Sequence, residues 1–298
     1  MSAGPARTEG ANGLPTRPLG RTGFNVTCVA LGGVKYNQRS DAHAAAVVHR
    51  ALDLGINYID TAHTYRGSER KIGLVMAERR DEVFLATKSL RRDRDGMAAE
   101  IEQSLERLQT DRLDCVQIHD LAREEELSEV MGPNGALRAI EESRQAGAVR
   151  FVGVTGHRNP EILVRALEEY PFDILLVSLG AMQAAVRPFY ETVMPAALER
   201  GVGVIGMKVM AHGWFGEAGL AEDALRFVLD LPDVSTALVG VDDVEQLEQN
   251  VRVTREGRAL SEAERRDLLD RVKRLYEKEP GRAWFIHPQA AGPERRTR

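Results

Sequence analysis

Four side chains of complementary chemistry lie at or just beyond the ends of three consecutive apolar runs: Asp60, Tyr65, Lys88 and His119. A tyrosine titrates near pH ~10, so it is a poor acid at neutral pH unless a cation stabilises its phenolate. Lys88 could supply that cation, and Asp60 could hold the lysine charged and oriented. His119 could donate a hydrogen bond to a carbonyl oxygen as it becomes an alkoxide. The set fits acid-assisted addition to, or removal from, the carbon of a C–O group.

Taken singly, each of these residues also has a structural interpretation. A lone aspartate or lysine at a strand end often pairs across a loop, and a lone histidine is commonly a satisfied polar residue under a loop. A loop tyrosine more often packs than titrates. If none of the four residues were catalytic, four unrelated structural roles would have to coincide on consecutive strands. We therefore interpret the set as catalytic.

Eight short apolar runs alternate with segments of helical periodicity, with roughly 30 residues for each strand–helix unit. Several runs are apolar at consecutive positions, which is typical of parallel strands covered on both faces. The predicted strands are 27–31, 56–60, 83–87, 115–119, 151–155, 173–179, 203–207 and 236–239. The pattern favours an α/β fold of the (β/α)8 TIM barrel type over an open doubly wound sheet. In such a barrel the C-terminal strand ends form one rim, where catalytic groups lie.

The segments between the runs carry helix signals. Ile101, Leu105 and Leu108 form one apolar stripe. Ser40 is a plausible first helix cap, and Ser261 begins a capping-box pattern before a final helix that ends near residue 279. Glycines at predicted helix ends suit the left-handed conformation that glycine adopts at little cost, and they are Gly55, Gly147 and Gly201.

The composition of the 298 residues is that of a globular protein, with 43 % apolar and 29 % charged residues and a net charge of −5. This charge gives no electrostatic reason to bind nucleic acid or an anionic membrane, so we expect a small-molecule ligand. No apolar run approaches the ~20 residues of a membrane helix. Cys28 and Cys115 lie in apolar runs without a metal-like cluster, which favours a reducing, cytoplasmic location and no metal.

The domain organisation expected from these patterns is simple. Residues 1–16 are predicted to be a flexible leader, because they lack the apolar segment of a secretory signal and are rich in Gly, Ala, Thr and Pro. Residues 17–279 are predicted to form one barrel domain, and residues 280–298 a C-terminal tail.

Several segments resemble a known family. The closest in pattern are DTAHTYRGSERKIG (60–73), VFLATKS (83–89) and LDCVQIH (113–119), which resemble signatures of the aldo-keto reductase superfamily. PLGRTGFNVTCVALGG (18–33) is similar to its N-terminal β-hairpin and first strand, and weaker similarity includes 201–210 and 238–250. The resemblance implies a (β/α)8 barrel with an N-terminal hairpin and a C-terminal helix and tail. It also implies a nicotinamide-dependent oxidoreductase.

The resemblance implies roles for individual residues. Tyr65 would be the general acid, with Lys88 lowering the pKa of Tyr65 and Asp60 supporting Lys88. His119 would orient the carbonyl of a small aldehyde, ketone or sugar, and the reverse reaction would oxidise an alcohol. The residues expected to bind NAD(P)H are Gly33, Thr155, His157, Lys208, Gly240, Asp242, Gln246 and Asn250.

The chain departs from the family pattern where the nicotinamide carboxamide is usually held. Thr155 and Gly156 stand in place of Ser-Asn, with His157 next to them, and Leu176 stands in place of a glutamine. Leu179 aligns with an aromatic residue that stacks on the nicotinamide ring. We therefore expect the cofactor either to bind weakly or to be held by other groups, because each lost hydrogen bond is worth ~1 kcal/mol.

The segment after the eighth strand carries acidic rather than basic residues. Asp242 and Asp243 would repel a 2′-phosphate, whereas an aspartate can accept hydrogen bonds from a free ribose diol, so NADH is weakly favoured over NADPH. Alternatively, both aspartates cap the last barrel helix. Trp214 and Trp284 lie in predicted rim loops, where they could form a substrate platform or plug the barrel mouth.

Other classes of function remain open from the sequence. A nicotinamide-binding regulatory or accessory barrel with little turnover would explain the altered carboxamide site. A Schiff-base lyase could use Lys208, which has no assigned partner in the sequence. A metal hydrolase built on His63, His119 and Asp120 is disfavoured by Lys88 nearby. The substrate, the reaction direction and the oligomeric state are not fixed by the sequence.

Overall fold

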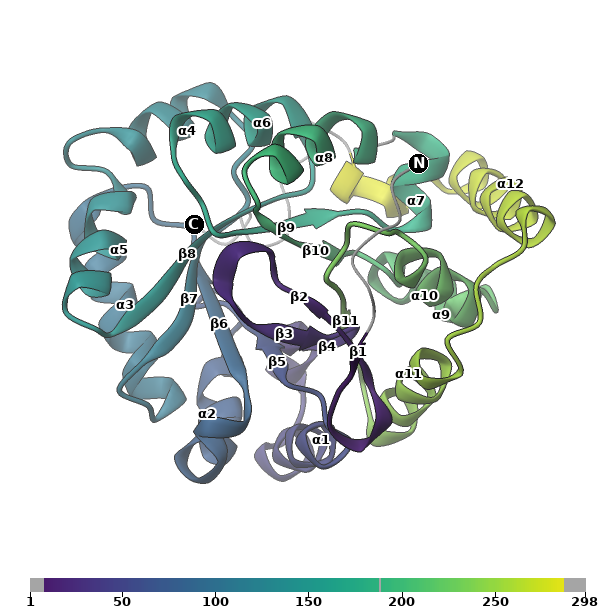
Figure 1. Cartoon of the computed structure of the whole chain (residues 1–298), viewed down its shortest axis with the longest axis horizontal. Coiled ribbons are helices and arrows are strands. Elements are labelled where there is room, and N and C mark those ends of the chain that lie inside the picture. The colour runs from purple at the N-terminus through teal and green to yellow at the C-terminus, as the bar shows by residue number, and fades with distance from the viewer. Residues whose placement is uncertain (1–7, 188, 287–298) are drawn as a thin grey trace.

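The computed structural model describes residues 8–187 and 189–286. Eight parallel strands close into a barrel in the order β10-β11-β4-β5-β6-β7-β8-β9, with the helices outside it (Figure 1). The strands are β4 (Val29–Gly32), β5 (Tyr58–Asp60), β6 (Phe84–Ser89), β7 (Leu113–Ile118), β8 (Val149–Gly156), β9 (Ile174–Ser178), β10 (Gly203–Met207) and β11 (Thr236–Gly240). The predicted (β/α)8 barrel is confirmed, and each predicted strand overlaps an observed one.

The inner face of the barrel changes from apolar to polar along three neighbouring strands. Because side chains alternate across a strand, every second residue faces the interior. The inward residues run from Tyr58 to Asp60 on β5, from Phe84 through Ala86 to Lys88 on β6, and from Cys115 through Gln117 to His119 at the end of β7. The same alternation that fills the barrel therefore delivers the polar residues to its C-terminal rim.

The helices begin and end where the sequence indicated. The Ser40 hydroxyl accepts from the His43 N–H, and Ser261 forms a capping box with Glu264. The three helix-end glycines adopt positive φ, and they are Gly55 (93°), Gly147 (82°) and Gly201 (63°). The helices are α1 (Asp41–Asp53), α2 (Ser68–Arg79), α3 (Arg94–Leu108), α4 (Glu124–Met131), α5 (Ala136–Gln145), α6 (Pro160–Glu169), α7 (Ala181–Val186), α8 (Tyr190–Glu199), α9 (Trp214–Glu217), α10 (Ala221–Leu229), α11 (Val244–Glu256) and α12 (Glu262–Lys278).

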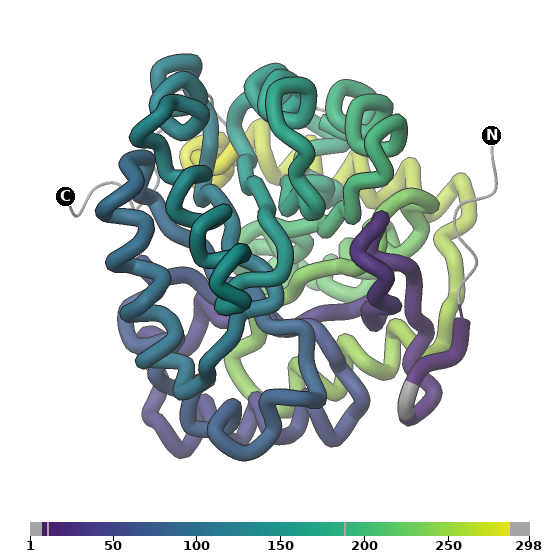
Figure 2. The backbone as a smooth tube through the Cα atoms, turned by 60° about the vertical axis from the view of Figure 1, so that its left-hand side comes forward, coloured from purple at the N-terminus to yellow at the C-terminus, as the bar shows by residue number. Residues whose placement is uncertain are grey.

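An N-terminal sheet covers the end of the barrel at which the strands begin (Figures 1 and 2). Its strands are β1 (Thr8–Glu9), β2 (Pro15–Pro18) and β3 (Asn25–Thr27), joined in the antiparallel order β1-β2-β3. The buried Arg17 donates to the carbonyl of Leu229 at 2.7 Å, and Arg21 donates to the carbonyl of Phe172 at 2.9 Å. Leu14 is completely buried. Residues 8–16 are thus part of the fold, which corrects the prediction of a leader for them; residues 1–7 lie outside the described part.

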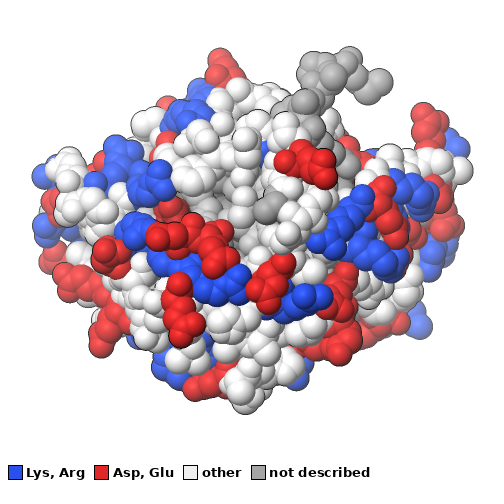
Figure 3. Space-filling view, turned by 60° about the horizontal axis from the view of Figure 1, so that its bottom comes forward, with Lys and Arg blue, Asp and Glu red and all other residues white. Residues whose placement is uncertain are grey.

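The last described segment, η6 (Pro280–Ile286), packs on the barrel. Phe285 and Ile286 are buried, so the predicted tail begins with a docked turn. Residues 287–298 lie outside the described part. Within the described ranges, no helix is long and apolar enough to cross a membrane. Figure 3 shows acidic and basic side chains interspersed over one face of the molecule.

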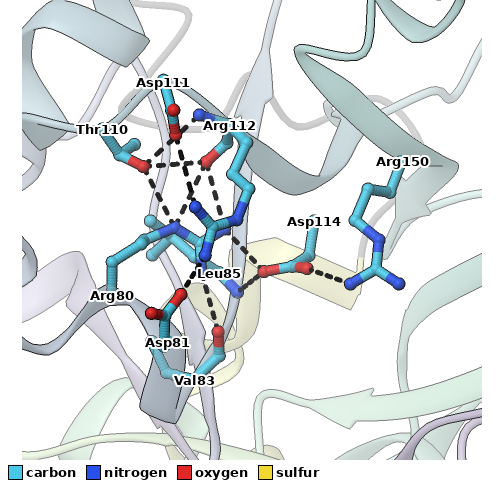
Figure 4. A network of polar contacts seen from close by, with 9 residues as sticks. All are labelled: Arg80, Asp81, Val83, Leu85, Thr110, Asp111, Arg112, Asp114 and Arg150. Atoms are coloured by element: carbon cyan, nitrogen blue, oxygen red, sulfur yellow. Dashed lines mark hydrogen bonds and ion pairs between the residues drawn. The ribbon is translucent and has the colours of Figure 1, made fainter.

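A polar network joins the first residues of β6 and β7 near the covered end of the barrel (Figure 4). The buried Asp114 carboxylate accepts from the Leu85 N–H at 2.9 Å and from Arg80 at 2.7 Å through one oxygen. Its other oxygen accepts from Arg150 at 3.1 Å. Arg80 also donates to the carbonyls of Val83 and Arg112. One carboxylate thus ties two strands and two arginines together.

Replacing Asp114 tests whether this network stabilises the barrel. Asp114→Ala leaves a buried backbone N–H and Arg80 without their acceptor, so we expect the free energy of unfolding to fall by about 3 kcal/mol. The measurement is urea denaturation followed by circular dichroism. Asp111→Ala, which alters an exposed carboxylate of the same network, should change stability by less than about 0.5 kcal/mol. Equal losses in the two variants would contradict the assignment.

Candidate active site

The structure brings Asp60, Tyr65, Lys88 and His119 together at the C-terminal rim, and we call these four residues the rim tetrad. Lys88 Nζ donates to a carboxylate oxygen of Asp60 and, at 2.6 Å, to the carbonyl of Thr61. The same ammonium lies 4.8 Å from the centroid of the Tyr65 ring. The rings of Tyr65 and His119 are 5.9 Å apart and nearly perpendicular. The predicted constellation therefore exists as one group of contacts.

The loop that carries Tyr65 is held by backbone bonds to the neighbouring strand. The N–H of Thr61 donates to the carbonyl of Ala86, and the N–H of His63 donates to the carbonyl of Lys88, each at 2.9 Å. These bonds continue the β5–β6 pairing beyond the end of β5. Gly67, at φ 74°, then turns the chain into α2. The main chain therefore brings Tyr65 near Lys88, and the contact between its ring and the ammonium completes the arrangement.

Asp60 has a second partner that the sequence analysis did not identify. Gln117 Nε2 donates to Asp60 Oδ2 at 2.6 Å, while Lys88 occupies Oδ1. Burial raises the pKa of Asp60, and the charge and hydrogen bond of Lys88 act in the opposite direction. Gln117 lies two residues before His119, so the period of a strand placed both on the inner face and could have predicted it.

His119 is neutral in this environment. Burial lowers the pKa of its imidazole well below the usual value, and the positive charge of Lys88 lowers it further. The carbonyl of His119 accepts from Arg92 at 2.8 Å, and its N–H donates to the carbonyl of Ser89 at 2.9 Å. These bonds hold the main chain of His119 in place, and its neutral imidazole can donate one hydrogen bond to a carbonyl oxygen without carrying a proton to it.

The rim tetrad lines one part of a cavity of about 870 Å³. Facing glycines of β4 and β11, Gly32 and Gly240, keep another part of its wall bare. A Cβ added to Gly32 would lie 3.2 Å from the Gly240 nitrogen, so the close pairing of these strands disfavours side chains there. The cavity residues that were expected to bind the cofactor are Gly33, His157, Lys208, Gly240, Asp242, Gln246 and Asn250.

Thr155 does not belong to this cavity wall. Its hydroxyl is buried and accepts from the N–H of Asp120 at 2.8 Å, which fixes the turn after β7. The expectation that Thr155 contacts the cofactor is therefore not supported by its position. Leu176 lines the cavity, whereas Leu179 is buried and does not line it. The apolar side chain of Met207 also lines the cavity. Gly156 also lies outside the wall.

The two aspartates after β11 have different partners. Asp243 caps α11 by accepting from the Gln246 N–H at 2.9 Å, as one of the two interpretations predicted. Asp242 instead accepts from Lys35 at 3.0 Å and from Arg39 at 2.7 Å. Burial acts to raise the pKa of Asp242, but the hydrogen bonds from Arg39 and Lys35 outweigh it and the pKa is lowered. The spacing of residues in the sequence did not predict that Lys35 or Arg39 would pair with Asp242.

Lys208 has a partner that the sequence did not reveal. Its Nζ lies 3.1 Å from His212 Nε2, and burial together with the nearby Lys208 lowers the pKa of His212 to about 2. The neutral imidazole accepts from the ammonium. Lys208, Ala211 and His212 all have positive φ, at 61°, 44° and 60°. The loop after β10 is thus strained where it meets the cavity.

The rim tryptophans lie behind the cavity wall. Neither Trp214 nor Trp284 is among the described residues that line the cavity. The Trp284 ring lies 5.1 Å from the ring of His212, which does line it. Their positions do not support the interpretation as a substrate platform. Within residues 8–187 and 189–286, no group of three or more His, Cys, Asp or Glu side chains could hold a metal ion.

The Lys88–Asp60 pair can be tested through stability alone. Lys88→Met leaves a buried carboxylate without its cation, so we expect a loss of about 3–5 kcal/mol in the free energy of unfolding at pH 7. Adding Asp60→Asn should recover most of it. Because burial raises the pKa of Asp60, the folded variant takes up a proton more readily than the unfolded chain, and the deficit should shrink as the pH falls.

Urea denaturation at pH 7 and pH 5 measures both effects. Lys273→Met, at an exposed position of α12, is the control and should change stability by less than about 0.5 kcal/mol. A double variant as unstable as Lys88→Met would show that the carboxylate charge is not the cause.

Known proteins are similar to this chain in sequence. The Aldo/keto reductase family model matches residues 29–223. L-galactose dehydrogenase of Arabidopsis thaliana is 27 % identical over 91 % of this chain and 97 % of the relative. 6-dehydroglucose reductase of Novosphingobium aromaticivorans is 32 % identical over 69 % of this chain and 70 % of the relative.

Solved structures agree with the observed fold. The holo form of aldo-keto reductase AKR11C1 from Bacillus halodurans has a TM-score of 0.74 at 24 % identity, covering 87 % of this chain and 96 % of that one. At that identity the likeness concerns the architecture. The family match runs from β4 into α10 and contains every residue of the rim tetrad. On this evidence of sequence and fold together, the chain belongs to the aldo/keto reductase family.

Proposed function

We propose that the protein is an NAD(P)-dependent oxidoreductase that interconverts a small carbonyl compound and its alcohol. Family membership and the names of the relatives support an oxidoreductase. The single observation that carries the finer proposal is the contact between the Lys88 ammonium and the Tyr65 ring beside the neutral His119. A cation next to a phenol favours release of its proton, and a neutral donor steadies the oxygen that receives it.

The side chains divide the proton chemistry between them. Tyr65 donates its hydroxyl proton to the carbonyl oxygen in the reducing direction and removes it in the oxidising direction. Lys88 stabilises the tyrosinate that remains, and Asp60 orients Lys88 by accepting its hydrogen bond. His119 donates a hydrogen bond to the same substrate oxygen. The nicotinamide, when bound, supplies or accepts the hydride at the carbonyl carbon.

The cavity is suited to such a dinucleotide. Its volume of about 870 Å³ lies within the range of small-molecule and cofactor sites. Gly213, Gly216 and Gly219 line it, and a Cβ at any of them would meet open space, so the backbone can approach a ligand closely. Gln246 and Asn250 supply polar side chains at the wall formed by α11. Leu176 offers no polar atom, so we expect less polar contact to the carboxamide.

The names of the relatives indicate which substrates to test first. Their names include L-galactose dehydrogenase, D-threo-aldose 1-dehydrogenase and pyridoxal 4-dehydrogenase. Polyhydroxy and other small aldehydes are therefore the first substrates to assay. NADH is the favoured cofactor, because a 2′-phosphate near Asp242 would have to compete with its carboxylate for Lys35 and Arg39.

Tyr65→Phe tests the proposed acid. We expect kcat for NADH-dependent reduction of an aldehyde to fall by at least about 10²–10⁴-fold, because the proton donor is lost while the ring remains. NADH affinity, measured by fluorescence titration, should change little. Tyr190→Phe, which removes a hydroxyl bonded to Asp233 elsewhere in the fold, is the matched control. Unchanged turnover in Tyr65→Phe would reject the assignment.

Binding without hydride transfer would point to a different function. A wild-type protein that binds NADH but shows no transfer in single-turnover assays would favour the regulatory or accessory barrel. Borohydride trapping of a carbonyl substrate on Lys208 would favour the Schiff-base alternative.

Asp242→Asn tests the cofactor preference. The change removes the anion that engages Lys35 and Arg39, so we expect the ratio of the NADPH to the NADH dissociation constant to fall by about tenfold, equivalent to ~1.4 kcal/mol. Fluorescence titration with both dinucleotides measures it. Asp243→Asn, which alters the helix cap, should leave the ratio within about twofold. Tighter binding of NADPH than NADH by the wild type would contradict the preference itself.

A further inference from the structure

His157 connects the barrel rim to the last described segment of the chain. Its Nδ1 lies 2.9 Å from the carbonyl oxygen of Phe285, which is 128 residues away in sequence. Because a carbonyl only accepts, Nδ1 must carry the proton of this hydrogen bond. His157 is buried and also lines the cavity. One imidazole therefore touches both the cavity and η6.

A buried charged pair, Asp120 and Arg158, lies beside the other side of this imidazole. His157 Nε2 lies 3.2 Å from Asp120 Oδ1, and Arg158 donates to Asp120 Oδ2 at 2.5 Å. Burial lowers the pKa of His157 to about 4, although Asp120 opposes the shift. In the neutral ring the single N–H is on Nδ1 and faces Phe285, so Nε2 makes no hydrogen bond to Asp120 and the Nδ1 bond is the one that orients the ring. Asp120 directly follows His119, so this group is continuous with the rim tetrad.

The same region contains a second attachment of η6. Arg187 donates to the carbonyl of Arg158 at 2.8 Å and lies 3.5 Å from the carbonyl oxygen of Ile286. Phe285 and Ile286 are buried. Among these contacts, His157 supplies the shorter hydrogen bond to η6, and it does so from the cavity wall.

Docking of η6 places one ring against the cavity residues. Trp284 lies 5.9 Å from the His157 ring and 5.1 Å from the His212 ring, and the Lys208 ammonium is 5.7 Å from its centroid. His157, His212 and Lys208 all line the cavity. If η6 moved away from the barrel, all three side chains would lose their contact with Trp284.

We propose that His157 is a positioning residue: by donating from Nδ1 to Phe285, it holds η6 on the barrel rim and so sets the cavity wall formed by His212 and Lys208. It contacts no reacting atom in this scheme. The docking itself does not depend on the proposed function. The consequence for substrate binding does rest on it, since it requires the carbonyl substrate to occupy the cavity beside the rim tetrad.

The docking is measured by hydrogen–deuterium exchange of the cofactor-free protein. His157→Ala removes the donor, so we expect amides of 281–286 to exchange about 5–10-fold faster, while those of β6 and β7 keep their rates. His157→Gln keeps an N–H donor and should recover part of the protection. His49→Ala, on α1, is the control and should leave the segment unchanged. Wild-type exchange rates for 281–286 in His157→Ala would overturn the proposal.

The effect on the cavity is measured with a probe aldehyde, 4-nitrobenzaldehyde, and NADH. At saturating NADH, we expect KM for the aldehyde to rise by about tenfold in His157→Ala, a larger change than the change in kcat. Trp284→Ala should act in the same direction, and the double variant should be little worse than either single variant, because both act through one support. A large loss of kcat with unchanged KM, or additive effects of the two substitutions, would overturn the positioning role.

Two controls keep these results separate from folding and from the proposed function. Should His157→Ala fail to fold, His157→Gln and Arg187→Ala test the same attachment, and faster exchange confined to 281–286 is the expected result for each. Uniformly faster exchange along the chain would overturn the proposal. A wild type without turnover would count against the proposed function alone, because the exchange measurements need neither cofactor nor substrate.

Discussion

The organisation of the rim depends on one buried ion pair. Lys88 and Asp60 come from adjacent strands and are both withdrawn from water, which is costly unless every polar atom is satisfied. Gln117 and the carbonyl of Thr61 complete the arrangement. Once the ammonium is fixed there, it lies over the Tyr65 ring and adds to the burial that lowers the pKa of His119. The proton chemistry we propose follows from that single placement.

The two ends of the barrel serve different purposes. At the closed end, the N-terminal sheet and the Asp114 network supply hydrogen bonds to buried polar groups (Figure 4). At the open end, positive φ values at Lys208 and His212 and bare glycine backbone concentrate strain and free volume. This division agrees with barrels in general, in which one face carries stability and the other carries chemistry.

Local patterns predicted much of the fold and the site. The strands, the caps at Ser40 and Ser261 and the rim tetrad all follow from periodicity and from which residues end a strand. The contacts that escaped prediction join distant parts of the chain, such as Asp242 with Lys35 and His157 with Phe285. Their sequence separation carries no periodic signal, since side-chain direction in loops is set by tertiary packing. Residues 8–16 were misassigned because strands as short as β1 and β2 are too short to show an alternating pattern.

The seam of the barrel has a consequence for the order of biosynthesis. β4 pairs with β11, so the first barrel strand in the sequence waits for the last one as its partner. A polypeptide emerging from the ribosome can therefore assemble open sheets, but it cannot complete the ring until β11 has been translated. The segment that meets His157 emerges later still. The cavity wall beside His157 is accordingly completed only after the barrel strands have been made.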